Sequence, residues 1–168
     1  MDAAELRALQ APIKQHYREH PEAARIPARA ECRLDRDDIA CTVPTSAGEV
    51  AAGLHKAAGG TGDLACSADM LLEALVACAG TTLRAVATAM SVTVWGGRII
   101  AEGSWDVRGT LGIDRAAPVG LTDIALRFEL DTDAAPDKLA RMIDTTERYC
   151  VILQTLKHPP SVTVASPA

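Results

Sequence analysis

The chain has 168 residues, 48% of them apolar, which suits one domain with a hydrophobic core and argues against disorder. A net charge of −5 leaves no basic surface for phosphate backbones or anionic lipid, and aromatic residues make up only 3%. We therefore expect neither nucleic acid nor a membrane as a partner, because both need cationic or aromatic surfaces.

The N-terminal residues are polar and charged and lack the apolar run and cleavage site of a secretory signal. No run of about 18 consecutive apolar residues follows, so the sequence predicts a soluble protein in the cytoplasm. Its five cysteines then face a reducing compartment, where disulfide scaffolds are rare. Reactivity or packing has to explain them.

Residues 2–19 are predicted to form a helix, because apolar side chains recur at three- and four-residue spacing. Residues 26–34 alternate apolar and charged side chains and predict a half-buried strand. Residues 39–43 resume the alternation after a turn at 36–38, so the two runs are expected to pair as an antiparallel hairpin. That turn would place Cys32 opposite Cys41.

Residues 48–54 predict a short strand, and a Gly-rich loop then leads into a helix that begins near Ser67. Ser67 is a suitable N-cap, and Asp69 lies in the first turn, where the helix dipole favours a carboxylate. Apolar and small residues recur along this helix at three- and four-residue spacing, which favours burial on nearly all sides: Leu71, Ala74, Leu75, Cys78, Thr82, Ala85, Val86 and Ala89.

Three further strands are predicted at residues 92–95, 99–108 and 121–131, each from alternating side chains. A second long helix is predicted from Pro136 to near Lys157, and residues 161–164 predict a last strand. Helices and strands therefore follow in an order typical of an α+β fold with antiparallel strands.

Cys78 and Cys150 each lie on the apolar stripe of a long predicted helix. One interpretation is that both are ordinary buried cysteines that pack like small apolar residues. The other is that the two helices pack together and bring the thiols into contact, close enough for a disulfide.

Two segments resemble the OsmC/Ohr family of peroxide-related thiol proteins: GGTGDLACSADMLLEALVACAGTTLRAVA at 59–87 and TERYCVILQTLKHPPSVTV at 146–164. They correspond to an Ala/Leu-rich helix that carries a cysteine and then threonine, and to a late helix with a second cysteine. The resemblance covers residues 25–164. We therefore divide the chain into an N-terminal helical extension, residues 1–24, and an OsmC-like domain, residues 25–168.

The resemblance implies an OsmC-like fold in which antiparallel sheets wrap around two central helices in an intertwined homodimer, with active sites made by both subunits. It implies a peroxidase that reduces organic, that is lipid or alkyl, hydroperoxides. Cys78 would form a sulfenic acid and Cys150 would resolve it as a disulfide. An external dithiol or lipoyl-type reductant would restore both thiols, and no bound cofactor is expected. The proline that commonly follows the second cysteine in the family is Val151 here.

In peroxidase members an arginine held by a carboxylate stabilises the reactive thiolate. Asp69 is either that carboxylate or only a residue that complements the helix dipole. The loop 53–66, where one branch carries the arginine, has none. The candidates are Arg25, Arg29, Arg33, Arg36, Arg84 and Arg148.

The remaining cysteines, Cys32, Cys41 and Cys66, are expected mainly to pack, although Cys32 and Cys41 could form a cross-strand thiol pair or contribute to a metal site, and Cys66 could be a third redox thiol. Neither Cys32 nor Cys41 has a CxxC partner. The four histidines show no metal-binding spacing, so no metal is predicted: His16, His20, His55 and His158. The GGTG sequence lacks the residues of a phosphate-binding loop and indicates a turn.

Two other functions compete with the peroxidase. One is a non-catalytic OsmC-like dimer that binds a small apolar ligand or acts as a redox sensor, with its cysteines kept for packing or slow oxidation. The other is a cysteine-dependent acyl transferase, which the sequence disfavours because no histidine lies near Cys78 or Cys150 in the two helices.

Overall fold

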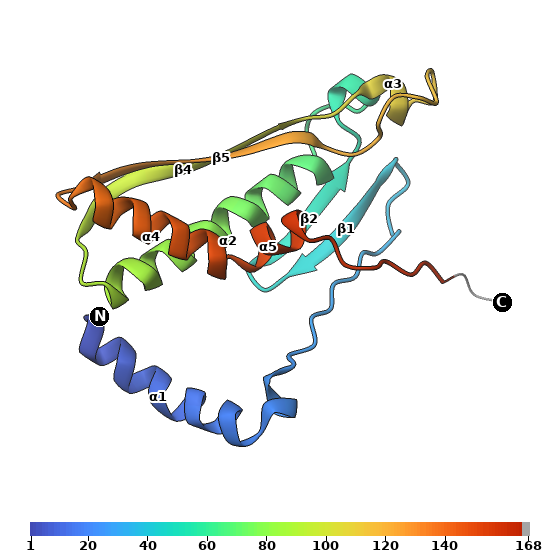
Figure 1. Ribbon diagram of the computed structural model, residues 1–168. Coiled ribbons are helices and arrows are strands. Elements are labelled where there is room, and N and C mark those ends of the chain that lie inside the picture. The colour runs from blue at the N-terminus through green and yellow to red at the C-terminus, as the bar shows by residue number, and fades with distance from the viewer. Residues whose placement is uncertain (166–168) are drawn as a thin grey trace. The chain divides into compact units, whose positions relative to one another are not determined.

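The computed structural model describes residues 1–165 and contains helices and strands in mixed order (Figure 1). The chain divides into two compact units. Unit 1 comprises Met1–Arg7, Ala74–Ile100 and the chain from Arg127 onward, and unit 2 comprises Ala8–Glu73 and Ala101–Leu126. Helices α1 (Ala3–Glu19) and α2 (Ser67–Ala89) and strands β4 (Val94–Ser104) and β5 (Thr122–Thr132) contribute residues to both units.

The core of unit 1 lies between α2, α4 (Pro136–Tyr149) and the ribbon of β4 and β5. Leu83, Val86 and Ala87 of α2 meet Met142 of α4, and partly buried side chains of the ribbon pack on this cluster. The ribbon is antiparallel, because Thr93 contacts Thr132 while Arg98 contacts Glu129. The stripe predicted for α4 faces this core through Leu139 and Met142. On α2 only Val86 of the predicted stripe belongs to the core, and its other members there, Leu83 and Ala87, lie outside that stripe. The expectation that α2 is buried on nearly all sides is wrong, because Ala74, Ala85 and Ala89 are exposed.

The second predicted helix is interrupted at Cys150, which separates α4 from α5 (Val151–Lys157) (Figure 1). Cys150 has an extended backbone, with φ −73° and ψ 105°. Its N–H still bonds to the Thr146 carbonyl at 2.9 Å, and its own carbonyl accepts from Gln154 at 2.9 Å. The prediction of one continuous helix to Lys157 is therefore wrong at this residue, and α5 begins with N–H groups that have no partner within the helix.

Unit 2 contains a three-stranded sheet in the order β1-β2-β3: Ala40–Thr45, Gly48–Gly53 and Ala65–Cys66. β1 and β2 are antiparallel and pair Thr45 with Gly48 across a two-residue turn, whereas β2 and β3 are parallel. Unit 2 also holds the short helix α3 (Val107–Thr110) and the 3₁₀ helices η1 (Pro21–Ala24) and η2 (Lys56–Ala58). The predicted strand at 48–54 is confirmed.

The predicted strand at 26–34 is wrong, because only Arg33 is paired, in an isolated antiparallel bridge to Thr42. Pro27 removes one ladder donor in this segment. Ile26 and Leu34, at the two ends of the expected apolar face, are 72% and 85% exposed. Along its whole length β1 pairs with β2, and the single bridge to Arg33 places Cys32 diagonal to Cys41 instead of opposite to it as expected.

Two further expectations need correction. The strands predicted at 92–95 and 99–108 form the single strand β4, which ends at Ser104, and Asp106 then caps α3 by accepting from the Arg108 N–H. Gly97 continues β4 with φ +128°, and a Cβ there would lie 2.2 Å from the Glu129 carbonyl oxygen. Residues 161–164 follow two prolines and form no strand.

The predicted leading helix is confirmed as α1, whose side chains are all exposed or partly exposed. Helix α2 is long and apolar enough to cross a membrane by length and composition alone. Leu75, Ala79 and Leu83 of α2 are nevertheless buried within the protein, as in the core helix of a globular fold.

Candidate active site

Cys78 and Cys150 are in side-chain contact in unit 1. Cys78 comes from the middle of α2 and is partly buried, whereas Cys150 is fully buried at the junction of α4 and α5. The structure thus brings together the two thiols that the sequence singled out. Both are reduced.

The surroundings of Cys78 stabilise its thiolate. Burial raises the pKa of this thiol, but the backbone N–H of Ile152, the Cys150 thiol, the backbone N–H of Val151 and the Thr82 hydroxyl act in the opposite direction and hold the pKa below its ordinary value. A sulfur in contact with several hydrogen-bond donors carries negative charge at lower free energy, as cysteines at helix N-termini do.

Cys150 has the opposite character. Burial raises the pKa of its thiol, and although the Leu153 N–H lowers it, the neighbouring Cys78 sulfur raises it further. When one of two touching sulfurs ionises, the other donates a hydrogen bond to it and keeps its proton. Of the two thiols, Cys78 is therefore the more readily ionised.

The interruption at Cys150 explains this difference and was missed at the sequence level. Because the chain turns at Cys150, the first N–H groups of α5 reach the Cys78 sulfur instead of bonding within a continuous helix. A proline at position 151 would have marked the start of a new helix, since proline is favoured at the first helical position. Val151 gives no such signal. Thr82 was noted only as part of the apolar stripe.

The structure gives Asp69 no partner among residues 1–165. It is exposed in the first turn of α2, nine residues before Cys78. Arg84 donates to the Val94 carbonyl at 2.7 Å, and the Arg148 guanidinium lies 5.7 Å from the centre of the Tyr149 ring.

Three of the four candidate arginines of unit 2 are engaged with carboxylates of the same unit, and among the described residues Arg25 pairs with none. Arg29 pairs with Glu31, Arg36 with Asp38, and Arg33 with both Asp35 and Glu49. Exposed pairs of this kind contribute little to stability. The sequence led us to expect an arginine beside Cys78. Among the described residues, the groups that contact this thiol are instead backbone N–H donors and the side chains of Thr82 and Cys150.

The other cysteines fall into one pair and one single thiol. The Cys32 and Cys41 side chains contact each other in unit 2, and Cys66 ends β3. Within residues 1–165, no group of three or more His, Cys, Asp or Glu side chains is arranged to hold a metal ion.

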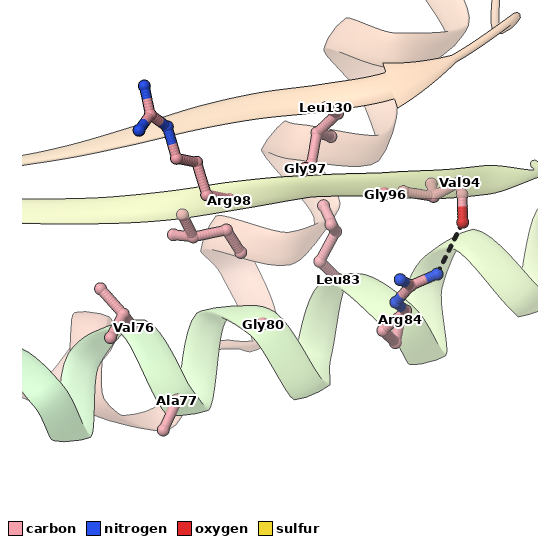
Figure 2. A pocket seen from close by; sticks show the side chains of 11 residues that line it. Val76, Ala77, Gly80, Leu83, Arg84, Val94, Gly96, Gly97, Arg98 and Leu130 are labelled. Atoms are coloured by element: carbon pink, nitrogen blue, oxygen red, sulfur yellow. Dashed lines mark hydrogen bonds between the residues drawn. The ribbon is translucent and has the colours of Figure 1, made fainter.

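A cleft of about 320 Å³ lies between α2 and the β4–β5 ribbon in unit 1 (Figure 2). Val76, Gly80 and Leu83 line its helical side, and the Arg84 bond to the Val94 carbonyl closes one end. At about 100° per residue, Cys78 points roughly 160° around α2 from Val76 and Gly80. The cleft therefore does not open onto the thiol pair.

A second groove is lined by residues that flank Cys150 in the chain. It is open, has a volume of about 440 Å³, and is lined by Arg148, Tyr149, Val151, Gln154, Thr155, His158 and Pro160. Neither Cys78 nor Cys150 lines it, but Val151 belongs to its lining and the backbone N–H of the same residue contacts Cys78. Tyr149 and Val151 are 60% and 67% exposed and give the groove an apolar wall.

Unit 2 has a separate cavity of about 310 Å³, lined mostly by apolar side chains together with His55 and Cys66. The His55 ring meets the Trp105 ring edge-on, with centroids 5.3 Å apart. Its Nδ1 accepts from the Ala57 N–H at 3.0 Å. This cavity has the size and composition of a site for a small apolar ligand.

The comparisons with known proteins agree with this arrangement. The family model for OsmC-like proteins matches residues 60–165, a range that includes both Cys78 and Cys150. The chain therefore belongs to the OsmC-like family. No curated protein matches it.

Three solved structures illustrate the fold. An OsmC-like protein from Mycoplasma pneumoniae is similar with a TM-score of 0.64 and 19% identity, over 80% of this chain and 91% of that one. A putative osmotic stress induced and detoxification response protein from Psychrobacter arcticus has a TM-score of 0.62 and 14% identity, over 80% and 91%. An organic hydroperoxide resistance protein from Elizabethkingia anophelis has a TM-score of 0.56 and 13% identity, over 80% and 92%. The chain thus has the OsmC-like fold.

Proposed function

We propose that the protein is a thiol-dependent peroxidase that reduces organic hydroperoxides at Cys78. The observation that carries the proposal is the contact of the Cys78 sulfur with the Cys150 thiol and with the first N–H groups of α5, which lowers the pKa of Cys78. A stabilised thiolate beside a second thiol is what a two-cysteine peroxidase needs.

The chemistry follows in two steps. The Cys78 thiolate attacks one peroxide oxygen, the O–O bond breaks, and the alkoxide takes a proton and leaves as an alcohol, so that Cys78 becomes a sulfenic acid. The Cys150 thiol then loses its proton, attacks the Cys78 sulfur and expels the hydroxyl group as water. An external dithiol or lipoyl-type reductant reduces the resulting Cys78–Cys150 disulfide by thiol–disulfide exchange.

The groove beside Val151 supports an organic substrate. Its apolar wall of Tyr149 and Val151 favours an alkyl chain, whereas hydrogen peroxide has no group to fill it. We further propose that the protein acts in the cytoplasm as a homodimer and without a resident cofactor, as the family resemblance implies.

The test is to treat the reduced full-length protein with one equivalent of cumene hydroperoxide or of hydrogen peroxide and to map disulfides by mass spectrometry over time. Trypsin places Cys150 on residues 149–157 but leaves Cys66 and Cys78 together on residues 57–84. A Cys66→Ser variant removes that ambiguity. The expected result is rapid linkage of Cys78 to Cys150, faster with cumene hydroperoxide.

Two further variants separate the steps. Cys78→Ser should abolish peroxide consumption, while Cys150→Ser should form a sulfenic acid on Cys78 that a diketone reagent traps. Peroxide consumption that survives in Cys78→Ser would contradict the proposal. So would the absence of any oxidation within minutes.

The cavity in unit 2 favours a second candidate, an OsmC-like dimer that binds a small apolar ligand without catalysis or serves as a redox sensor. For this function Cys78 should react with peroxide no faster than an ordinary buried thiol, and both Cys78→Ser and Cys150→Ser should leave ligand binding intact. Titration with a fluorescent apolar probe, followed through Trp105 emission, measures that binding.

A further inference from the structure

Cys32 and Cys41 form a second thiol pair, separate from Cys78 and Cys150. Both lie in unit 2, Cys41 within β1 and Cys32 in the irregular segment that precedes it. Their side chains are in contact. Cys32 is exposed and Cys41 is partly buried, so the pair is open to small molecules on one side.

The backbone fixes this contact. Arg33 and Thr42 exchange two backbone hydrogen bonds, of 2.8 and 3.0 Å, in an antiparallel bridge. Cys32 and Cys41 each precede a bridge residue, so their side chains leave the same face as diagonal neighbours, a spacing from which side chains reach each other.

Side chains add to the constraint. The Arg33 guanidinium bonds to Asp35 at 3.0 Å and to Glu49 of β2 at 2.6 Å, and the Asp35 carboxylate accepts from the Thr42 side chain. These bonds tie the irregular segment to β1 and β2. They thereby hold the backbone on either side of the bridge from which Cys32 and Cys41 project.

We propose that Cys32 and Cys41 are a second redox site, a surface dithiol that reacts with small-molecule disulfides and closes to an intramolecular disulfide. A metal is the weaker interpretation, since within residues 1–165 no third ligand joins the two thiols in a metal-binding arrangement. Exchange needs only one accessible thiol and a second thiol in contact with it.

The proposed exchange between the dithiol and a small-molecule disulfide has two steps. The Cys32 thiolate attacks one sulfur of a disulfide RSSR, which breaks the S–S bond, forms a Cys32–SR mixed disulfide and releases RS⁻ to take up a proton. Cys41 then loses its proton and its sulfur attacks Cys32, which expels the second RS⁻. Two cysteines are oxidised and one RSSR is reduced to two RSH.

The two thiols have different tasks in this exchange. Cys32 is exposed and makes the first attack. Burial, and then the neighbouring Cys32, raise the pKa of Cys41, so Cys41 is a poor first nucleophile and acts only after Cys32 has become a mixed disulfide. The closed disulfide would anchor the segment before β1 covalently to that strand.

The test uses the reduced full-length protein with excess oxidised glutathione, then acid quenching, alkylation and tryptic mapping. Cleavage after Arg29, Arg33, Arg36 and Lys56 places Cys32 on residues 30–33 and Cys41 on residues 37–56, so an internal disulfide appears as one linked pair of peptides. The expected result is that this linked pair is the main product among the oxidised peptides that contain Cys32 or Cys41. Cys66, which has no thiol neighbour among the described residues, provides the internal control and should carry only glutathione.

Matched variants identify the order of attack. Cys41→Ser should stop at one glutathione on Cys32, and Cys32→Ser should slow oxidation of Cys41 by about tenfold or more. Both variants should keep the hydroperoxide-reducing activity of the wild type, which separates this site from Cys78. Glutathione left on Cys32 in the wild type, linkage between Cys32 residues of two chains, or reduced Cys32 and Cys41 when Cys66 is already modified would each overturn the proposal.

Discussion

The contrast between Cys78 and Cys150 arises from the direction in which hydrogen bonds are donated. Cys78 receives them from two N–H groups of α5, from Thr82 and from Cys150, so its negative charge is stabilised despite burial. Cys150 is the donor in the shared bond and is fully buried, so ionisation is disfavoured there. One contact therefore assigns different roles to two residues of the same type.

This contrast predicts the pH dependence of alkylation. Because the pKa of Cys78 is lowered, its thiolate fraction at a given pH is larger than that of an ordinary thiol, whose pKa is about 8.5. The rate of iodoacetamide modification at Cys78 should therefore reach half its maximum below that pH, as followed by quenched mass spectrometry in the Cys66→Ser protein. A half-maximum above pH 8.5 would show that burial outweighs the donors.

Thr82 provides a residue-level test of the same stabilisation. Thr82→Val keeps the shape but removes the hydroxyl donor, which should raise the pKa of Cys78. Its reaction with alkylating reagent at pH 7 should then slow by roughly three- to fivefold. Thr82→Ser retains a hydroxyl and should behave like the wild type. Equal profiles for the valine and serine variants would mean that the hydroxyl does not act on Cys78.

At the scale of elements, the break between α4 and α5 produces the site. α4 ends with a bond from the Cys150 N–H to Thr146, and the extended backbone of Cys150 redirects the chain before α5 begins. An uninterrupted helix would bond the N–H groups of Val151 and Ile152 to carbonyls four residues earlier. The interruption frees them for the Cys78 sulfur.

Val151→Pro tests this break. Cys150 has φ −73° and ψ 105°, a conformation that a following proline permits, and the exposed Val151 is the first residue of α5, where proline is favoured. The free energy of unfolding should therefore change by less than about 1 kcal/mol. The pKa of Cys78 should rise, because the Val151 N–H is lost.

Thermal unfolding and the alkylation profile together measure the two effects. Proline within a continuous helix destabilises by about 3 kcal/mol or more, so a loss of that size would show that α4 and α5 are one helix in solution. Met142→Ala is a reference variant that shows how much a loss of core packing lowers the free energy of unfolding. Met142 is fully buried in the unit 1 core, and its truncation should destabilise by about 2–5 kcal/mol.

The long helices α1, α2 and α4 and the strand β5 could be predicted from their periodicity, because side chains on one face of an element are buried together, as Met142 and Thr146 are on α4. The alternation at 26–34 has the same appearance but no face to pack on, so the pattern alone misled. Sequence predicted the pair Cys78 and Cys150 through the family resemblance. The sequence could not show the hydrogen-bond donors at Cys78. They depend on the backbone conformation of Cys150, and the spacing of apolar residues does not reveal a change of φ and ψ at one residue.

At the scale of the whole molecule, the distribution of burial bears on assembly. In unit 2, Ala52 is the only apolar residue that is buried among the described residues, while Ile26, Leu34 and Ile39 are more than 70% exposed. In unit 1, Trp95 and Tyr149 are each 60% exposed. Exposed apolar side chains in such number are typical of surfaces that a partner covers, and obligate homodimers bury the most apolar interfaces.

The family resemblance implies that this partner is a second copy of the chain. The molar mass of the protein in solution tests that prediction. Light scattering coupled to gel filtration should give twice the 17.7 kDa of one chain, without dissociation on dilution to nanomolar concentration. The thermal midpoint should rise with protein concentration over the range where the dimer reforms, because folding and association are then linked. A monomeric mass together with a concentration-independent midpoint would contradict the dimer. Ile26, Leu34 and Ile39 would then be exposed in the functional protein, and substituting each by serine should leave the midpoint unchanged.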